Sequence, residues 1–135
     1  MFQLFIYPML DHRHRTPSSH ALEDPNLWNE QTNRLAWEFD LGTPAGHDEI
    51  PAYASVSLAT YLANLPPAFV CVGDLDIFLD EDIDYAQRLF AAGVPCDLVV
   101  YPGLFHGADS FMPSATISQR LEAGFLGVLK QRLGL

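Results

Sequence analysis

Three short apolar runs constrain the fold of this chain more than any other feature. They lie at residues 2–7, 68–73 and 97–101, and each is bounded by Pro, Gly or Asp, where a chain commonly leaves a sheet. Runs that are nearly continuously apolar, rather than alternating, are typical of strands covered on both faces, as in parallel sheets. The sequence therefore predicts about three parallel strands.

Helical periodicity follows the second and third runs. Residues 82–92 carry apolar side chains three and four positions apart, with acidic residues near the start and Gly93 at the end. Residues 114–133 repeat the pattern, and Gly134 follows. The apolar positions are Ile83, Ala86, Leu89, Phe90, Ile117, Leu121, Phe125, Val128 and Leu129. Since parallel crossovers are right-handed in nearly all proteins, this strand–helix–strand order predicts an α/β fold in which helices flank the sheet.

About sixty residues separate the first two predicted strands, far more than a routine crossover needs. Within this stretch, residues 8–64, we expect a helix over residues 27–39 that contains Trp28 and Trp37. A second, shorter helix is expected over residues 53–62. Connections of this length usually carry function.

Charge and cysteine usage narrow the classes of partner and compartment. The chain has 17 acidic and 7 basic residues, a net charge of −10, which would repel nucleic acid and anionic membrane surfaces. Cys71 and Cys96 lie in apolar runs, where a free thiol behaves as a small hydrophobe, so a reduced, cytoplasmic setting is expected. Residues 1–10 contain no basic side chain and their apolar stretch is broken by Gln3 and Pro8, so we expect neither a signal peptide nor a membrane span.

One long segment resembles a known family. Residues 65–109 read LPPAFVCVGDLDIFLDEDIDYAQRLFAAGVPCDLVVYPGLFHGAD. The segment resembles the C-terminal catalytic region of the hormone-sensitive-lipase-like esterases and lipases, in the α/β-hydrolase superfamily. The shared features are a strand ending in Gly, an Asp shortly after it, an Asp–Glu pair opening a helix, an Ala–Gly turn, a further strand and a His–Gly. The resemblance implies that residues 1–135 form one partial α/β-hydrolase domain, with 8–64 as the excursion and 65–135 as the unit bearing the acid and histidine.

Carried over by position, the resemblance assigns Asp76 as the acid and His106 as the base of a Ser–Asp–His triad. Each follows a predicted strand, at the end where open α/β sheets place their sites. Taken alone, an Asp at such a point is more often a cap or turn former, and a lone loop His is usually uninvolved in chemistry. The joint pattern favours the catalytic assignment. Asp80 is expected to be the N-cap of the following helix, and Asp74 a neighbour of the acid.

A serine nucleophile is not recognisable. None of the seven serines has the glycines of a G-x-S-x-G elbow, and no HGGG-like run could form an oxyanion hole. The serines are Ser18, Ser19, Ser55, Ser57, Ser110, Ser114 and Ser118. Since a dense apolar run starts at the second residue, we expect the chain to begin mid-fold and the missing N-terminal half to supply these groups. The isolated chain is then expected to be inactive.

Other candidate site residues give weaker indications of function. Phe78 and Phe105 flank the expected dyad and, with Trp28, are candidates for a substrate pocket, although such aromatic residues are more often packing. His12 and His14 in a polar loop are expected to be solvated rather than metal-ligating, so we expect no metal. No cofactor is implied.

The sequence thus predicts a carboxylesterase of small-molecule esters by family, with two alternatives. One is a non-catalytic fragment that self-associates, as a dimer or larger homo-oligomer, through the exposed edge of residues 2–7. The other is a small flavodoxin-like ligand-binding domain, which ranks last because no Gly-rich phosphate loop follows any predicted strand.

Overall fold

The structure, a computed structural model, describes residues 1–42 and 50–135. Three parallel strands form its sheet in the order β1 (Gln3–Ile6), β2 (Ala68–Gly73) and β3 (Cys96–Tyr101). Residue 3 pairs with residue 68, and residue 68 with residue 96. The predicted parallel strands and the α/β class are confirmed.

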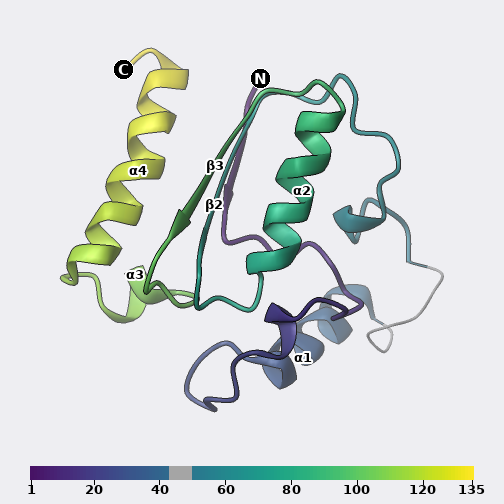
Figure 1. Cartoon of the computed structure of the whole chain (residues 1–135), viewed down its shortest axis with the longest axis vertical. Coiled ribbons are helices and arrows are strands. Elements are labelled where there is room, and N and C mark those ends of the chain that lie inside the picture. Colours follow the sequence, from purple (N-terminus) through teal and green to yellow (C-terminus); the bar gives the residue numbers. More distant parts are fainter. Residues whose placement is uncertain (43–49) are drawn as a thin grey trace.

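Helices cover both faces of the sheet, as Figure 1 shows. On one side α2 (Leu79–Ala91) packs its Tyr85 and Leu89 against Ala68 of β2. On the other side α4 (Thr116–Leu133) packs Leu121 against Phe69 and Cys71 of the same strand. Because consecutive strand residues point to opposite faces, β2 is buried at all six positions. This explains the unbroken apolar run in the sequence.

Shorter elements lie beyond the carboxyl ends of the strands, in the lower part of Figure 1. They are the 3₁₀ turn η1 (Ser18–His20) and the helices α1 (Glu30–Leu41) and α3 (Ala108–Phe111). A second 3₁₀ turn, η2 (Val56–Leu58), lies beside α2 (Figure 1), where Arg88 donates to the Ser57 carbonyl at 2.9 Å. The first part of the long excursion therefore lies at the edge of the sheet where parallel strands present their functional loops.

Two helix predictions in this excursion need correction. The helix expected over residues 27–39 begins later, because Asn29 is its N-cap and accepts a hydrogen bond from the Thr32 backbone N–H at 3.0 Å. Trp28 therefore lies outside α1. The helix expected over residues 53–62 is wrong: the chain makes only η2 there, since Ser55 is extended and its hydroxyl donates to the Leu10 carbonyl at 3.1 Å.

The start of α2 also differs from expectation. Its N-cap is Phe78 rather than Asp80. The Asp80 carboxylate lies in the first turn and accepts a hydrogen bond from the Ser18 backbone N–H at 2.8 Å. Asp80 thus ties the excursion to α2 instead of capping the helix.

Candidate active site

The Asp76 carboxylate and the His106 imidazole meet beyond the ends of β2 and β3. Asp76 Oδ2 lies 3.0 Å from His106 Nδ1, and the Asp76 side chain is 1% exposed. The other carboxylate oxygen, Oδ1, accepts the Phe78 backbone N–H at 3.1 Å. An acid held from both oxygens can fix the orientation of the imidazole, which leaves Nε2 as the nitrogen available for proton transfer.

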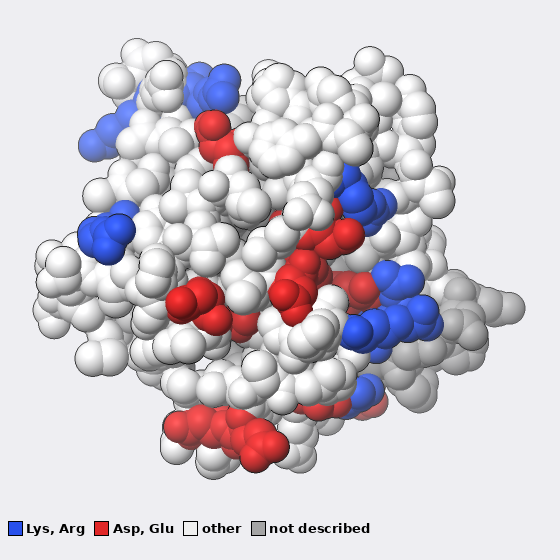
Figure 2. Space-filling model, in the orientation of Figure 1, with Lys and Arg blue, Asp and Glu red and all other residues white. Residues whose placement is uncertain are grey.

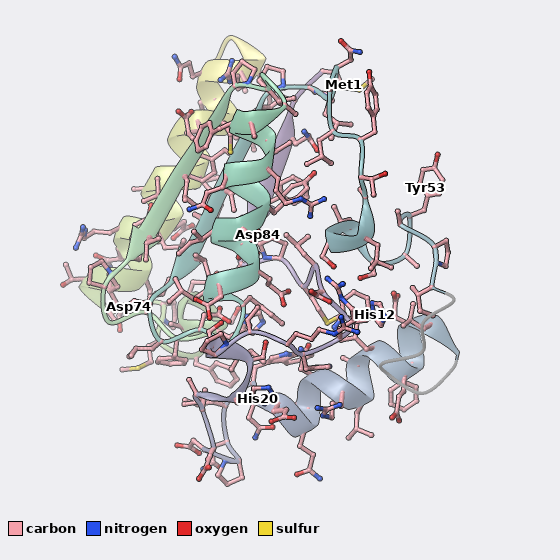
Figure 3. The ribbon with its side chains drawn as sticks, turned by 45° about the vertical axis from the view of Figure 1, so that its right-hand side comes forward. Met1, His12, His20, Tyr53, Asp74 and Asp84 are labelled. Carbon is pink, nitrogen blue, oxygen red and sulfur yellow. The ribbon has the colours of Figure 1, made fainter. Side chains whose placement is uncertain are left out.

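Backbone contacts hold the two loops that carry this pair. The Leu75 N–H donates to the Leu104 carbonyl at 3.1 Å, which continues the pairing of β2 and β3 past their ends. The Asp74 carboxylate accepts the Gly103 N–H at 2.6 Å, and Figure 3 shows Asp74 at this end of the sheet. Gly103 and Gly107 have φ angles of +83° and +72°, which favour glycine. The local turns therefore depend on the Gly residues that flank His106.

Three aromatic rings surround the imidazole of His106. The ring centroids of Tyr7, Phe78 and Trp28 lie 4.7, 5.0 and 5.3 Å from it. Phe78 is buried, and Trp28 donates a hydrogen bond from Nε1 to Asn33 at 3.3 Å. Sequence reasoning singled out Phe78 and Trp28 but missed Tyr7, which is distant in sequence and follows a strand that bears neither the acid nor the histidine.

A largely apolar hollow of about 410 Å³ opens beside the acid. Phe105 lines it, whereas Phe78 and Trp28 contact the imidazole instead. Its lining residues are Pro17, Ser18, Ala21, Leu22, Leu27, Asp74, Leu75, Asp76, Leu79, Asp80 and Phe105. Loop and strand-end residues thus build an apolar concavity next to a polar group, the form that small-molecule sites usually take.

Two buried carboxyl groups lie close behind the acid. Glu81 accepts the backbone N–H groups of Leu10 at 2.6 Å and Asp11 at 3.2 Å, and burial raises its pKa to about 8. Asp82 is fully buried, and neither of its oxygens has a hydrogen-bond partner among the described residues. Burial, with a smaller contribution from Glu81, raises the pKa of Asp82 well above its usual value. Both groups therefore favour the neutral, protonated form.

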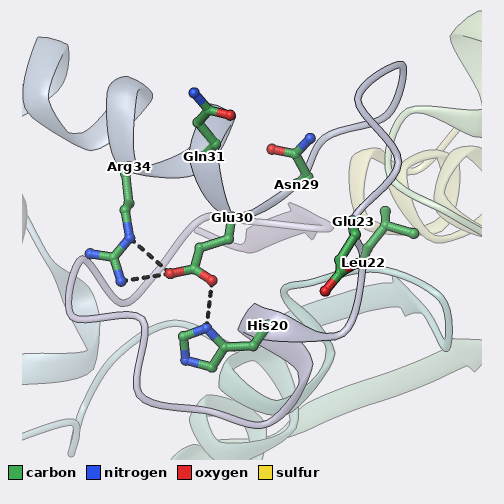
Figure 4. A pocket seen from close by; sticks show the side chains of 7 residues that line it. All are labelled: His20, Leu22, Glu23, Asn29, Glu30, Gln31 and Arg34. Atoms are coloured by element: carbon green, nitrogen blue, oxygen red, sulfur yellow. Dashed lines mark hydrogen bonds and ion pairs between the residues drawn. The ribbon is translucent and has the colours of Figure 1, made fainter.

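A second pocket, of about 340 Å³, is lined mostly by polar residues and shares Leu22 with the first hollow (Figure 4). There Glu30 accepts from Arg34 Nε at 2.9 Å and lies 2.7 Å from His20 Nδ1. The pocket is lined by His20, Leu22, Glu23, Asn29, Glu30, Gln31 and Arg34. These contacts join η1 to α1, and we assign the pocket no chemistry.

The expectation that His12 and His14 are solvated is wrong. Both are buried, and the His12 ring packs edge-on against Trp37 of α1, 6.0 Å between centroids. His12 Nδ1 lies 2.9 Å from the Ser55 hydroxyl, and His14 Nδ1 lies 3.3 Å from the Asn33 side-chain amide. Burial lowers the pKa of His14 to about 4, so it is neutral at physiological pH. Through Trp37 and Asn33 the two histidines pack α1 against the start of the excursion, and Figure 3 shows His12 beside α1.

No serine hydroxyl bonds to His106 within the parts of the chain that the structure describes. Ser55 contacts His12 instead, and Ser118 donates to the Ala108 carbonyl at 3.1 Å. Ser110 is exposed on α3. Across residues 1–42 and 50–135 there is also no group of three or more His, Cys, Asp or Glu side chains suited to a metal, and no helix both long and apolar enough to cross a membrane. On the described part of the face in Figure 2, basic side chains form no continuous surface.

Comparison with known proteins decides the family. The family model described as alpha/beta hydrolase fold matches residues 1–110. This chain belongs to the α/β-hydrolase fold family. The predicted resemblance is thereby confirmed over most of its length.

Several proteins similar to this α/β-hydrolase are named as esterases or ester hydrolases. It is 29% identical over 128 residues to an ethyl acetate hydrolase of Pseudomonas putida, covering 95% of this chain and 39% of that protein. It is 32% identical over 124 residues to esterase LipI of Mycobacterium tuberculosis, covering 86% and 37%. The structure superposes on a bacterial heroin esterase with a TM-score of 0.87 at 34% identity, covering 96% of this chain and 42% of that one. The α/β-hydrolase chain thus spans about two fifths of the length of these relatives.

Proposed function

We propose that this chain contributes the acid and base of a Ser–Asp–His carboxylesterase. The observation that carries the proposal is the 3.0 Å contact between Asp76 Oδ2 and His106 Nδ1 beyond the strand ends. In this role Asp76 fixes the imidazole, and Nε2 removes the proton of a serine hydroxyl as it attacks the ester carbonyl. The same nitrogen then returns the proton to the leaving alcohol.

The nucleophile and the oxyanion donors belong, in this proposal, to a further part of the fold that this sequence does not contain. None of the seven serines lies in a G-x-S-x-G elbow, and the relatives are more than twice as long. The substrate is a small-molecule ester. Phe78 and Trp28, against the imidazole, and Phe105, in the adjacent hollow, are the proposed pocket residues.

The proposal is tested by hydrolysis of short p-nitrophenyl esters. The 135-residue chain is expected to be no faster than its His106→Ala variant, because a base without a nucleophile has nothing to activate. A protein extended upstream to include a G-x-S-x-G elbow is expected to be active. Turnover by the 135-residue chain that depends on one of its own serines would overturn the proposal, and Ser110 is the first to replace.

A second candidate, self-association without catalysis, is favoured by the edge of the sheet. Within residues 1–42 and 50–135, β1 pairs with β2 alone, and it carries half-buried Leu4, Phe5 and Ile6. Beside it lies a mostly apolar hollow of about 510 Å³, and the neighbouring Tyr53 is fully exposed and points outward in Figure 3. Unpaired strand edges with apolar side chains promote association between copies.

A further inference from the structure

Tyr7, directly after β1, has a backbone conformation that tyrosine rarely adopts. Its φ is +38°, in the left-handed region, although its N–H still donates to the Cys71 carbonyl at 2.7 Å and so continues the pairing with β2. Non-glycine residues held in this region cluster at functional sites, because the surrounding contacts must compensate the strain. The contacts of the Tyr7 side chain therefore call for a functional explanation.

The Tyr7 ring contacts the proposed catalytic base. Its centroid lies 4.7 Å from that of the His106 imidazole, with 70° between the ring planes, an edge-to-face arrangement. Of the three aromatic rings around the imidazole, this one is nearest. The ring therefore limits the rotation of the imidazole away from Asp76.

The Tyr7 hydroxyl is fixed as well. It donates to Asp109 Oδ1 at 2.9 Å, a contact between residues 102 positions apart. Asp109 lies in the first turn of α3, three residues after His106. Burial, and then the hydrogen bond to Asp109, raise the pKa of the Tyr7 phenol, so the hydroxyl remains a donor. One side chain thus touches the imidazole and anchors the segment that follows it.

We propose that Tyr7 is a positioning residue for His106, acting through its ring and through the hydrogen bond to Asp109. The ring sets the rotation of the imidazole, and the hydroxyl sets the position of the backbone that carries it. Together they keep Nδ1 directed at Asp76 Oδ2. This inference rests on the proposed role of His106 as the base.

The test observes the imidazole directly, in the 135-residue chain and without a substrate. In ¹⁵N-histidine NMR at neutral pH, an Nδ1–H that donates to a buried carboxylate gives a downfield proton resonance that exchanges slowly with water. Its loss in His106→Gln assigns it. We expect Tyr7→Phe and Asp109→Ala to lose the resonance or to speed its exchange at least tenfold. Asp109→Asn keeps an oxygen that can accept the hydrogen bond from the Tyr7 phenol, so this variant should retain the slowly exchanging resonance.

Tyr101→Phe is the matched control, because the Tyr101 hydroxyl lies against Gly124 of α4, away from His106. Slow exchange that persists in both Tyr7→Phe and Asp109→Ala would overturn the proposal, as would loss in Tyr101→Phe to the same degree. Should Tyr7→Phe fail to fold, as judged from its amide spectrum, the Asp109→Ala and Asp109→Asn pair decides. Absence of the resonance from the unaltered chain would contradict the dyad and Tyr7 together. If the NMR variants behave as expected but the extended protein shows no ester turnover, only the proposed function is contradicted.

Discussion

Gly73, the last residue of β2, lies directly against the backbone carbonyl of Leu104. A Cβ atom at position 73 would overlap the Leu104 carbonyl oxygen and carbon. Asp76 follows Gly73 by three residues, and His106 follows Leu104 by two. The close backbone approach thus sets the spacing of the two loops that carry the proposed acid and base, and it explains why a glycine ends this strand.

Gly73→Ala is expected to lower the free energy of unfolding by about 3 kcal/mol, because the added methyl group meets backbone rather than a side chain that could move. Urea unfolding measures this. The control is Gly127→Ala on the exposed side of α4, where nothing lies within 4 Å of the new Cβ. Because alanine favours a helix more than glycine does, this variant should raise the free energy of unfolding by up to about 1 kcal/mol. An equal decrease in the free energy of unfolding in both variants would contradict the close approach of Gly73 to the Leu104 backbone.

Asp76→Asn in the extended protein is expected to reduce kcat by a factor on the order of 10⁴ with little change in KM, because an amide in place of the carboxylate holds the imidazole in the wrong tautomer. Steady-state hydrolysis of a p-nitrophenyl ester gives both constants. Asp74→Asn is the matched neighbour: its amide oxygen can still accept the Gly103 N–H, so near-normal turnover is expected. A smaller loss in Asp76→Asn than in Asp74→Asn would remove the triad assignment.

The strands of the sheet could be predicted from the sequence because each one appears as a short, continuous apolar run. Burial on both faces requires an apolar residue at every position of β2, and this appears directly as the run from Ala68 to Gly73. The C-terminal end of α4 was also predictable, since Gly134 adopts the left-handed conformation that ends a helix, whereas the helix begins at Thr116 rather than at residue 114. The positions of Asp76 and His106 came from a family resemblance rather than from periodicity.

What the sequence could not predict depends on contacts between distant residues. The Tyr7 contact with His106 joins strand ends far apart in the chain, and no local pattern marks it. His12 is buried in a segment whose composition indicates a solvated loop, because Trp37 and Ser55 approach it from elsewhere. The helix expected over residues 53–62 fails for the same reason, since Ser55 bonds to the Leu10 carbonyl and not to its own turn.

Asp82→Ala is expected to stabilise the chain by about 1 kcal/mol at pH 8, since it removes a buried carboxyl group whose oxygens lack partners among the described residues. Chemical denaturation at that pH measures the change. Asp84→Ala removes an exposed carboxylate from the same helix (Figure 3) and should change stability by less than about 0.5 kcal/mol. Destabilisation by Asp82→Ala larger than that by Asp84→Ala would indicate that Asp82 has an unrecognised partner.

The edge of β1 is expected to drive self-association of the 135-residue chain, because among the described residues the strand pairs with β2 alone and three of its four side chains are apolar. Multi-angle light scattering should show a mass that rises with concentration. In the extended protein the added strands would cover this edge, so a concentration-independent mass is expected there. A clean monomer of the short chain at high concentration would contradict an exposed edge.

The buried Glu81 carboxyl should make stability fall as pH rises. Burial raises its pKa from 4.5 to about 8 in the folded chain, against the hydrogen bonds that it accepts from Leu10 and Asp11. Between pH 4.5 and 8 the folded chain therefore holds a proton that the unfolded chain has lost, and the free energy of unfolding decreases through this window. Asp82 contributes with the same sign. His14, with its pKa lowered to about 4, acts in the opposite direction, but only below pH 6.5.

Between pH 6.5 and 8 His14 no longer contributes, so the change of the free energy of unfolding with pH reports on the buried carboxyl groups. In this interval Glu81→Gln tests the contribution of Glu81. The Gln amide oxygen can still accept the Leu10 and Asp11 N–H groups, but it carries no titrating proton. Its advantage over the unaltered chain should grow with pH, with a slope of at most about 1.4 kcal/mol per pH unit. Glu122→Gln, exposed on α4, is the control and should follow the unaltered chain. Parallel stability curves for Glu81→Gln and the unaltered chain, measured by urea unfolding at half-unit steps, would show that Glu81 is already ionised in the folded state.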